Sequence, residues 1–258
     1  MTNDTLPYEN VPPLFPLDTI GQGLDRLILS SDDFDPNGEY KIRFGIYTTP
    51  NPKPGRVGEV VLSRTRTPEG NFLLTFTFKK QHTSGMTFAG GYIRMVNDPL
   101  ALPDGWVFGS WLETANETIL PATRLQKQFS TVETNTEKTI LRCKTTMNDD
   151  REQIEEITID GPYALSFGLL DSVQRLPGAE MEPFSFTLID HFDQIKPEHT
   201  LRYRGTVDVP VESETIPMTV YDQTGRGVLP LTYYVDPNGC LTAMVSGLEA
   251  YIREPVEE

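Results

Sequence analysis

The feature that most constrains this chain is a two-residue alternation of apolar and polar side chains. The segment YKIRFGI at 40–46 shows it first, with an apolar residue at every even position. This alternation places successive side chains on opposite faces of a β-strand and is typical of a half-buried strand. The pattern returns at intervals of about ten residues, separated by turn residues, which indicates an antiparallel sheet. The further expected strands are 57–64, 71–80, 86–96, 106–113, 126–133, 138–146, 153–160, 184–190, 200–209, 215–221, 231–235 and 241–245.

Two segments depart from this alternation and are expected to be helical. Apolar residues within 17–28 recur at helical spacing, which predicts a short helix there. A second helix of about 13 residues is expected over 163–175, because Pro162 suits the start of a helix and a Pro-Gly pair ends the run. Two DPNG tetrads, 35–38 and 236–239, have the residue order of a tight hairpin turn.

These elements predict a mainly β fold, with a curved antiparallel sheet that forms a half-barrel or a calycin-like barrel. One or two short helices are expected to pack on the sheet. The pair Gly90-Gly91 is expected to mark a bend, as a half-barrel requires. Residues 1–16 contain four prolines and are expected to form an extended N-terminal arm. No low-complexity linker divides the rest, so 17–258 is expected to be a single β-rich domain.

The charge of the chain excludes some classes of partner. The 37 acidic and 22 basic residues give a net charge of −15, which repels phosphate backbones and argues against nucleic-acid binding. No run of 18 apolar residues occurs, so no membrane-spanning helix is expected. The acidity is concentrated in residues 151–258, which hold 19 acidic and 7 basic side chains. Excess surface acid mainly keeps proteins soluble, and we expect an acidic, soluble protein.

The sequence leaves the compartment and the state of the cysteines open. The N-terminal segment has no basic region followed by an apolar core, so no secretory signal is expected. This fits a cytoplasmic protein, and it equally fits a periplasmic or secreted protein whose leader was removed. Cys143 and Cys240 have no CxxC neighbour, which gives no support to structural zinc or thioredoxin-type chemistry. A disulfide between these two cysteines and two separate buried thiols both fit the sequence. The sequence also leaves the oligomeric state open.

The second half of the chain resembles a known group of families. The segments GPYALSFGLLDSVQRLPG, FSFTLIDHFD, LRYRGTVDV and LPLTYYVDPNGCLTAMV follow one another as a helix, two strands and a closing strand pair. Over residues 137–246 this order resembles the DUF3108-type families, bacterial proteins of largely unassigned function. Their curved antiparallel half-barrel is similar to the lipoprotein-carrier (LolA-like) folds. The resemblance implies a half-barrel and an apolar-ligand role, and it supplies no catalytic residues.

The leading hypothesis is a binding protein, without enzymatic activity, for an apolar or amphipathic small molecule. Aromatic side chains on a concave sheet offer a surface that buries ligand hydrocarbon. Neither a cofactor nor a metal ion is expected. The expected wall residues are Phe76, Phe78, Trp106, Phe108 and Tyr233, and the expected polar anchors are Arg202 and Arg204, which share a strand face.

Two alternatives belong to other classes. The first is a cyclase or isomerase of a calycin-like type, which needs no metal or cofactor and uses an acid–base pair in its pocket. Its candidate catalytic residues come from the stretch where two of the three histidines lie close to carboxylates: Asp190, His191, His199 and Tyr203. The second alternative is a protein-interaction module whose acidic face meets a basic partner.

Overall fold

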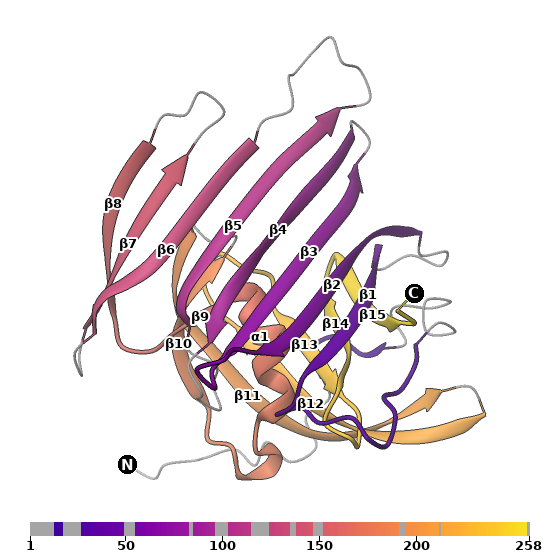
Figure 1. Cartoon of the computed structure of the whole chain (residues 1–258). Coiled ribbons are helices and arrows are strands. Elements are labelled where there is room, and N and C mark those ends of the chain that lie inside the picture. The colour runs from indigo at the N-terminus through magenta and orange to yellow at the C-terminus, as the bar shows by residue number, and fades with distance from the viewer. Residues whose placement is uncertain are drawn as a thin grey trace.

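The structure is a computed structural model, and it describes most of the chain. The described residues are 13–17, 27–48, 55–82, 85–95, 103–114, 124–134, 138–146, 152–190, 194–211 and 213–256. For 103–114 and 124–134 the description covers the backbone alone. This part is mainly β, with one short α-helix (Figure 1).

The strands are β1 (Tyr40–Thr48), β2 (Arg56–Arg66), β3 (Phe72–His82), β4 (Gly85–Met95), β5 (Pro103–Thr114), β6 (Arg124–Thr134), β7 (Lys138–Thr146), β8 (Glu152–Asp160), β9 (Tyr163–Leu165), β10 (Phe184–Asp190), β11 (Gln194–Val211), β12 (Glu214–Thr224), β13 (Leu231–Val235), β14 (Leu241–Ser246) and β15 (Glu249–Glu254). The helical elements are α1 (Ser166–Ser172) and the 3-10 turns η2 (Val173–Arg175) and η3 (Gly178–Glu180).

All the strands belong to one sheet, in the order β8-β7-β6-β5-β4-β3-β2-β1-β15-β14-β13-β12-β11-β10-β9. The neighbours run antiparallel except β9 and β10, which are parallel. Pairing of β1 with β15 joins the two halves of the chain at the middle of the sheet. The sheet curves around α1, which lies on its concave side (Figure 1). The expected fold class, a curved antiparallel sheet with a short packing helix, is confirmed.

The helix expected over 163–175 is shorter than predicted. Its first three residues form β9, which pairs in parallel with Thr187–Ile189 of β10. The Thr187 amide also donates to the carbonyl oxygen of Pro162 at 2.9 Å. Tertiary pairing therefore overrides the helical spacing of the apolar residues. Of the helix expected over 17–28, residues 18–26 lie outside the described part, and 27–28 are not helical.

The chain buries apolar side chains on both faces of its C-terminal strands. One cluster fills the concave side and includes Tyr221, Tyr233 and Leu241. A second cluster lies on the other face and includes Met218, Tyr234 and the N-terminal Leu17 and Leu27. Part of the segment expected as an arm is fixed here, since the Tyr234 hydroxyl donates to the Phe15 carbonyl at 2.8 Å.

The two DPNG tetrads have different roles. The tetrad 236–239 joins β13 to β14 as a tight turn, with the Gly239 amide donating to the Asp236 carbonyl at 2.9 Å. The Asp236 carboxylate also accepts hydrogen bonds from the Ser30 amide and hydroxyl, at 2.8 and 2.7 Å. The tetrad 35–38 forms a turn before β1 and does not connect two paired strands, so the hairpin expected there is absent from the described pairing.

Three other expectations concern single features of the chain. The ladder between β3, β4 and β5 passes through Gly90-Gly91 without a register shift there. No helix within the described ranges is both long and apolar enough to cross a membrane.

Cys240 is a buried free thiol whose pKa is raised to about 12 by burial. The side chain of Cys143 lies outside the described part.

Candidate functional site

An inner cavity of about 650 Å³ lies between the concave face of the sheet and α1. This volume is within the range of small-molecule pockets in proteins. Its lining comes from both halves of the sheet and from the helix, so the cavity exists only in the folded chain. The apolar lining residues include Phe78, Ala89, Phe167, Leu169, Leu170, Leu188, Leu231, Tyr233 and Met244.

The alternation of β3 explains one wall of this cavity. Every second side chain from Phe72 to Phe78 faces the concave side, where Phe76 is buried and Phe78 is half-buried. Phe167 of α1 stacks on Phe76 with ring centroids 4.5 Å apart and meets Phe78 edge-on at 6.2 Å. Aromatic pairs in these arrangements stabilise contacts beyond area burial. These rings hold α1 against the sheet and leave Phe78 on the cavity wall.

Two ion pairs lie in the mainly apolar lining. Lys196 Nζ of β11 lies 2.6 Å from the Asp190 carboxylate of β10. Lys80 of β3 pairs with Glu249 of β15. All four of these residues line the cavity, and each charge has an opposite partner. The charged groups of the lining therefore sum to zero.

A buried chain of hydrogen bonds leads from the cavity into the sheet. The Tyr233 hydroxyl donates to Gln223 Oε1 at 2.5 Å, and the Gln223 amide nitrogen donates to His199 Nδ1 at 3.1 Å. His199 Nε2 lies 3.2 Å from the carbonyl oxygen of Arg226. Because Nδ1 accepts a hydrogen bond and Nε2 faces a carbonyl oxygen, His199 must be neutral with its proton on Nε2. Burial lowers the pKa of His199, and the nearby positive charge of Lys196 lowers it further.

The neutral state of His199 predicts a pH-dependent stability. In the unfolded chain this histidine takes up a proton near pH 6.5, whereas in the folded chain it does so only at lower pH. The free energy of unfolding should therefore fall as the pH drops below 6.5, by about 1 kcal/mol between pH 7 and 5.5. Urea denaturation at the two pH values measures this difference. A His199→Gln variant should lose that part of the pH dependence, and an equal dependence in both proteins would contradict the assignment.

The structure brings some of the predicted site residues together and separates others. Phe78, Asp190 and Tyr233 line the inner cavity. Phe76 lies behind Phe167, and His199 reaches the cavity only through Gln223. Trp106 and Phe108 are on β5 and His191 follows β10, and their side chains lie outside the described part.

Tyr203, Arg202 and Arg204 do not line the cavity. Tyr203 is half-buried and packs edge-on against Tyr221, with ring centroids 6.0 Å apart. A register shift between Tyr203 and Gly205 makes Arg204 an extra residue in β11, so the strand face expected for the two arginines is not regular. Arg204 Nε instead lies 2.5 Å from the buried carboxylate of Asp222.

Sequence reasoning missed the ion pairs and the polar chain of this cavity. Lys80 continues the inward row of β3 two residues after Phe78, and this spacing was a signal that could have found it. Gln223, Lys196 and Glu249 gave no comparable signal, because their positions depend on which strands pair and in which register.

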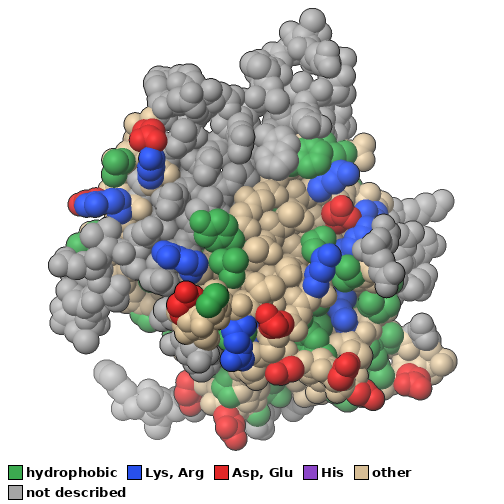
Figure 2. Space-filling view, in the orientation of Figure 1, with side chains coloured by type: hydrophobic (Ala, Val, Ile, Leu, Met, Phe, Trp, Pro, Cys, Tyr) green, Lys and Arg blue, Asp and Glu red, His purple; other side chains and the backbone are tan. Residues whose placement is uncertain are grey.

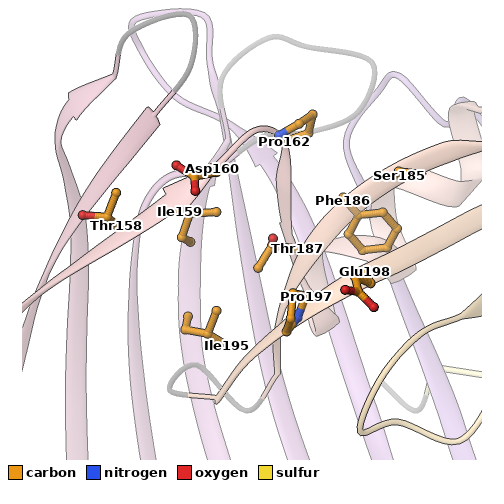
Figure 3. Close-up of a pocket in the computed structure, with 10 residues that line it drawn as sticks. All are labelled: Thr158, Ile159, Asp160, Pro162, Ser185, Phe186, Thr187, Ile195, Pro197 and Glu198. Carbon is orange, nitrogen blue, oxygen red and sulfur yellow. The ribbon is translucent and has the colours of Figure 1, made fainter.

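A second concavity, which we call the seam groove, lies where the two ends of the sheet meet (Figure 3). It measures about 490 Å³ and lies between β8 on one side and β10 and β11 on the other. Its lining residues are Thr158, Ile159, Asp160, Pro162, Ser185, Phe186, Thr187, Ile195, Pro197 and Glu198.

The fold and its inner cavity define a β-barrel-like domain. Among solved structures the chain is similar to a β-barrel-like protein of the domain of unknown function DUF1849 from Brucella abortus, with a TM-score of 0.54 and 10% identity. The match covers 86% of this chain and 98% of that chain. It shows the fold alone and supports a barrel-like domain of unknown function, without singling out the DUF3108-type or LolA-like families. No protein-family model and no curated protein matches the chain.

Proposed function

We propose that this protein binds an apolar or amphipathic small molecule in its inner cavity. The observation that supports this most is the apolar cavity itself, in which the charges are paired with one another. Removing apolar surface from water contributes about 25 cal/mol per Å², which is enough to hold a hydrocarbon ligand without any covalent step. The resemblance to half-barrel families with an apolar-ligand role remains a prediction and points in the same direction.

Exposed leucines support an entry route for such a ligand. Leu229, between β12 and β13, and Leu248, between β14 and β15, both line the cavity, yet their exposed fractions are 48% and 63%. Large apolar side chains that are exposed at the border of a pocket commonly mark a binding surface. We propose that the hydrocarbon part of the ligand enters between these two loops.

The ion pairs supply the polar end of this proposed site. Lys196 and Lys80 take the place of Arg202 and Arg204 as candidate anchors, because they line the cavity. A polar head group can accept a hydrogen bond from either ammonium group while the carboxylate partner keeps the charge balanced. An amphipathic ligand with a small polar head fits this arrangement better than a strongly charged one.

The test is native mass spectrometry of the protein purified without added ligand, compared with its denatured mass. We expect a reproducible adduct that leaves on denaturation, with a mass and solubility typical of a lipid or another apolar compound. Added long-chain alcohol should bind in a one-to-one ratio when the purified protein is empty. A protein that carries no such adduct and also does not bind the added alcohol would contradict the proposal.

The enzyme alternative remains a prediction. Asp190 is paired with Lys196, and both ring nitrogens of His199 have partners, so this acid and this base do not meet in the cavity. For the interaction alternative, acidic and basic side chains are interspersed over the described part of the face seen in Figure 2. Neither arrangement favours these alternatives over ligand binding.

A further inference from the structure

We propose that the seam groove binds an extended, basic peptide segment of a partner protein, which adds a strand between β8 and β10. The inference does not rest on ligand binding in the inner cavity. It rests on two strand edges that face one groove, on the alternation of side chains along β8, and on the acidic charge around it.

The first edge belongs to β8, the last strand at one end of the sheet. Its full length pairs with β7 on one side, and no described strand pairs with the other side. The backbone groups on such an edge form a ready template for another strand. Thr158, Ile159 and Asp160 of this strand line the seam groove (Figure 3).

The second edge belongs to the start of β10. The short β9 covers only Thr187–Ile189, and the Thr187 amide donates toward it, to Pro162. Hydrogen-bonding direction alternates along a strand, so Ser185 turns its amide and carbonyl to the same side as Thr187. Ser185 lies beyond the end of β9 and lines the seam groove. An incoming strand would therefore find backbone partners on both sides.

The side chains of β8 define the sequence that fits. Over 156–160, Ile157 and Ile159 are on its inner face, where Ile159 is buried, while Glu156 and Asp160 are on its outer face. Glu156 and Glu152 form exposed ion pairs with Arg142 and Lys144 of β7. A neighbouring strand should match this pattern, with apolar or small residues facing in and basic residues facing out. Asp160 lines the seam groove and adds a carboxylate at the end of β8.

The backbone at the other wall is strained. Glu198 has a φ of 61°, a left-handed conformation that is uncommon for a residue other than glycine. It belongs to a bulge, because Phe186 pairs with His199 while Leu188 already pairs with Lys196. Strained, bulged positions often lie at binding sites. Glu198 adds a second carboxylate to the seam groove, and its side chain is 63% exposed in the pair with Arg226.

The test uses three labelled nine-residue peptides and the full-length protein. KTKVKVKTK alternates basic and apolar or small residues, ETEVEVETE has the same pattern with acidic charge, and KKKKKTVVT has the basic composition without the alternation. Fluorescence anisotropy at physiological salt measures binding. We expect KTKVKVKTK to bind at least about tenfold more tightly than either of the others. No binding of KTKVKVKTK, or equal binding of the two basic peptides, would overturn the proposal.

Protein variants locate the site. Ser185→Pro removes a backbone amide that does not pair within the sheet, and edge strands tolerate proline at such positions. This variant should bind KTKVKVKTK at least about tenfold more weakly. Asp160→Lys should weaken it as well and avoids any change in the backbone. Glu214→Lys, at an exposed position in the β11–β12 hairpin, makes the same charge change elsewhere and should bind as the wild type does. Unchanged binding by both Ser185→Pro and Asp160→Lys would overturn the assignment to the seam groove.

Discussion

Replacing Asp171 with alanine should lower the free energy of unfolding by about 3–5 kcal/mol, the usual cost of removing one partner from a buried ion pair. Asp171 lies in the last turn of α1 and is fully buried, with an exposed fraction of 0%. Arg175 forms a two-pronged ion pair with it, and Arg64 Nε lies 3.3 Å from Oδ1. Without the carboxylate, two buried guanidinium groups would lack their common counterion.

The neighbours of Asp171 make this cost hard to avoid by rearrangement. The Tyr40 hydroxyl donates to Asp171 Oδ1 and accepts from Gln174 Nε2 at 2.8 Å. Burial, followed by the charge of Asp171, raises the pKa of Tyr40 well above its ordinary value, so the tyrosine stays protonated. Arg64 is also fixed, with its guanidinium carbon 3.4 Å from the centroid of the Phe72 ring. The network joins β1, β2 and α1.

Urea denaturation measures the free energy of unfolding of the Asp171→Ala variant, with Glu180→Ala as the control. Glu180 is an exposed acid on η3, and its removal should change the free energy of unfolding by no more than about 0.5 kcal/mol. Since α1 carries Phe167 and Leu170 of the cavity wall, Asp171→Ala should also weaken ligand binding. A loss of stability below about 1 kcal/mol would show that water or another side chain replaces the carboxylate.

The alternation of apolar residues was enough to predict most strands and the inward row of β3. Three of the residues predicted for the site also line the cavity: the aromatic Phe78 and Tyr233, and Asp190, which was chosen for its nearness to two histidines. Alternation fails where the chain departs from regular pairing. The bulge at Arg204 turned an expected ligand anchor into the partner of Asp222, and the parallel pairing of β9 shortened the expected helix.

Contacts between side chains on different strands account for most of the features that could not be predicted. Lys80 and Glu249 are 169 residues apart in sequence and meet only because β1 pairs with both β2 and β15, which brings the two halves together. The seam groove depends instead on curvature, because the two end strands of the sheet, β8 and β9, follow each other in sequence and the whole sheet must bend to connect them. Register and curvature determine such contacts, and a single sequence does not reveal them.

A carboxylate placed on the apolar wall should abolish most ligand binding. Phe78→Asp replaces a half-buried ring that lines the cavity with a charge that ligand hydrocarbon would desolvate. The expected cost is about 3 kcal/mol of binding free energy, or about a hundredfold weaker binding. The measurement is a fluorescence titration with N-phenyl-1-naphthylamine, an uncharged apolar probe, together with the thermal midpoint of each variant.

Tyr92→Asp is the matched control, because Tyr92 is an aromatic residue of β4 that is 39% exposed and does not line the cavity. It should bind the probe as the wild type does. Thr87→Trp, which fills the cavity from a half-buried lining position without adding charge, should also reduce binding. Loss of binding in Phe78→Asp and Thr87→Trp but not in Tyr92→Asp would place the ligand between β3, β4 and α1. Equal affinity in all four proteins would mean that the probe binds elsewhere, and the inner cavity would lose its role.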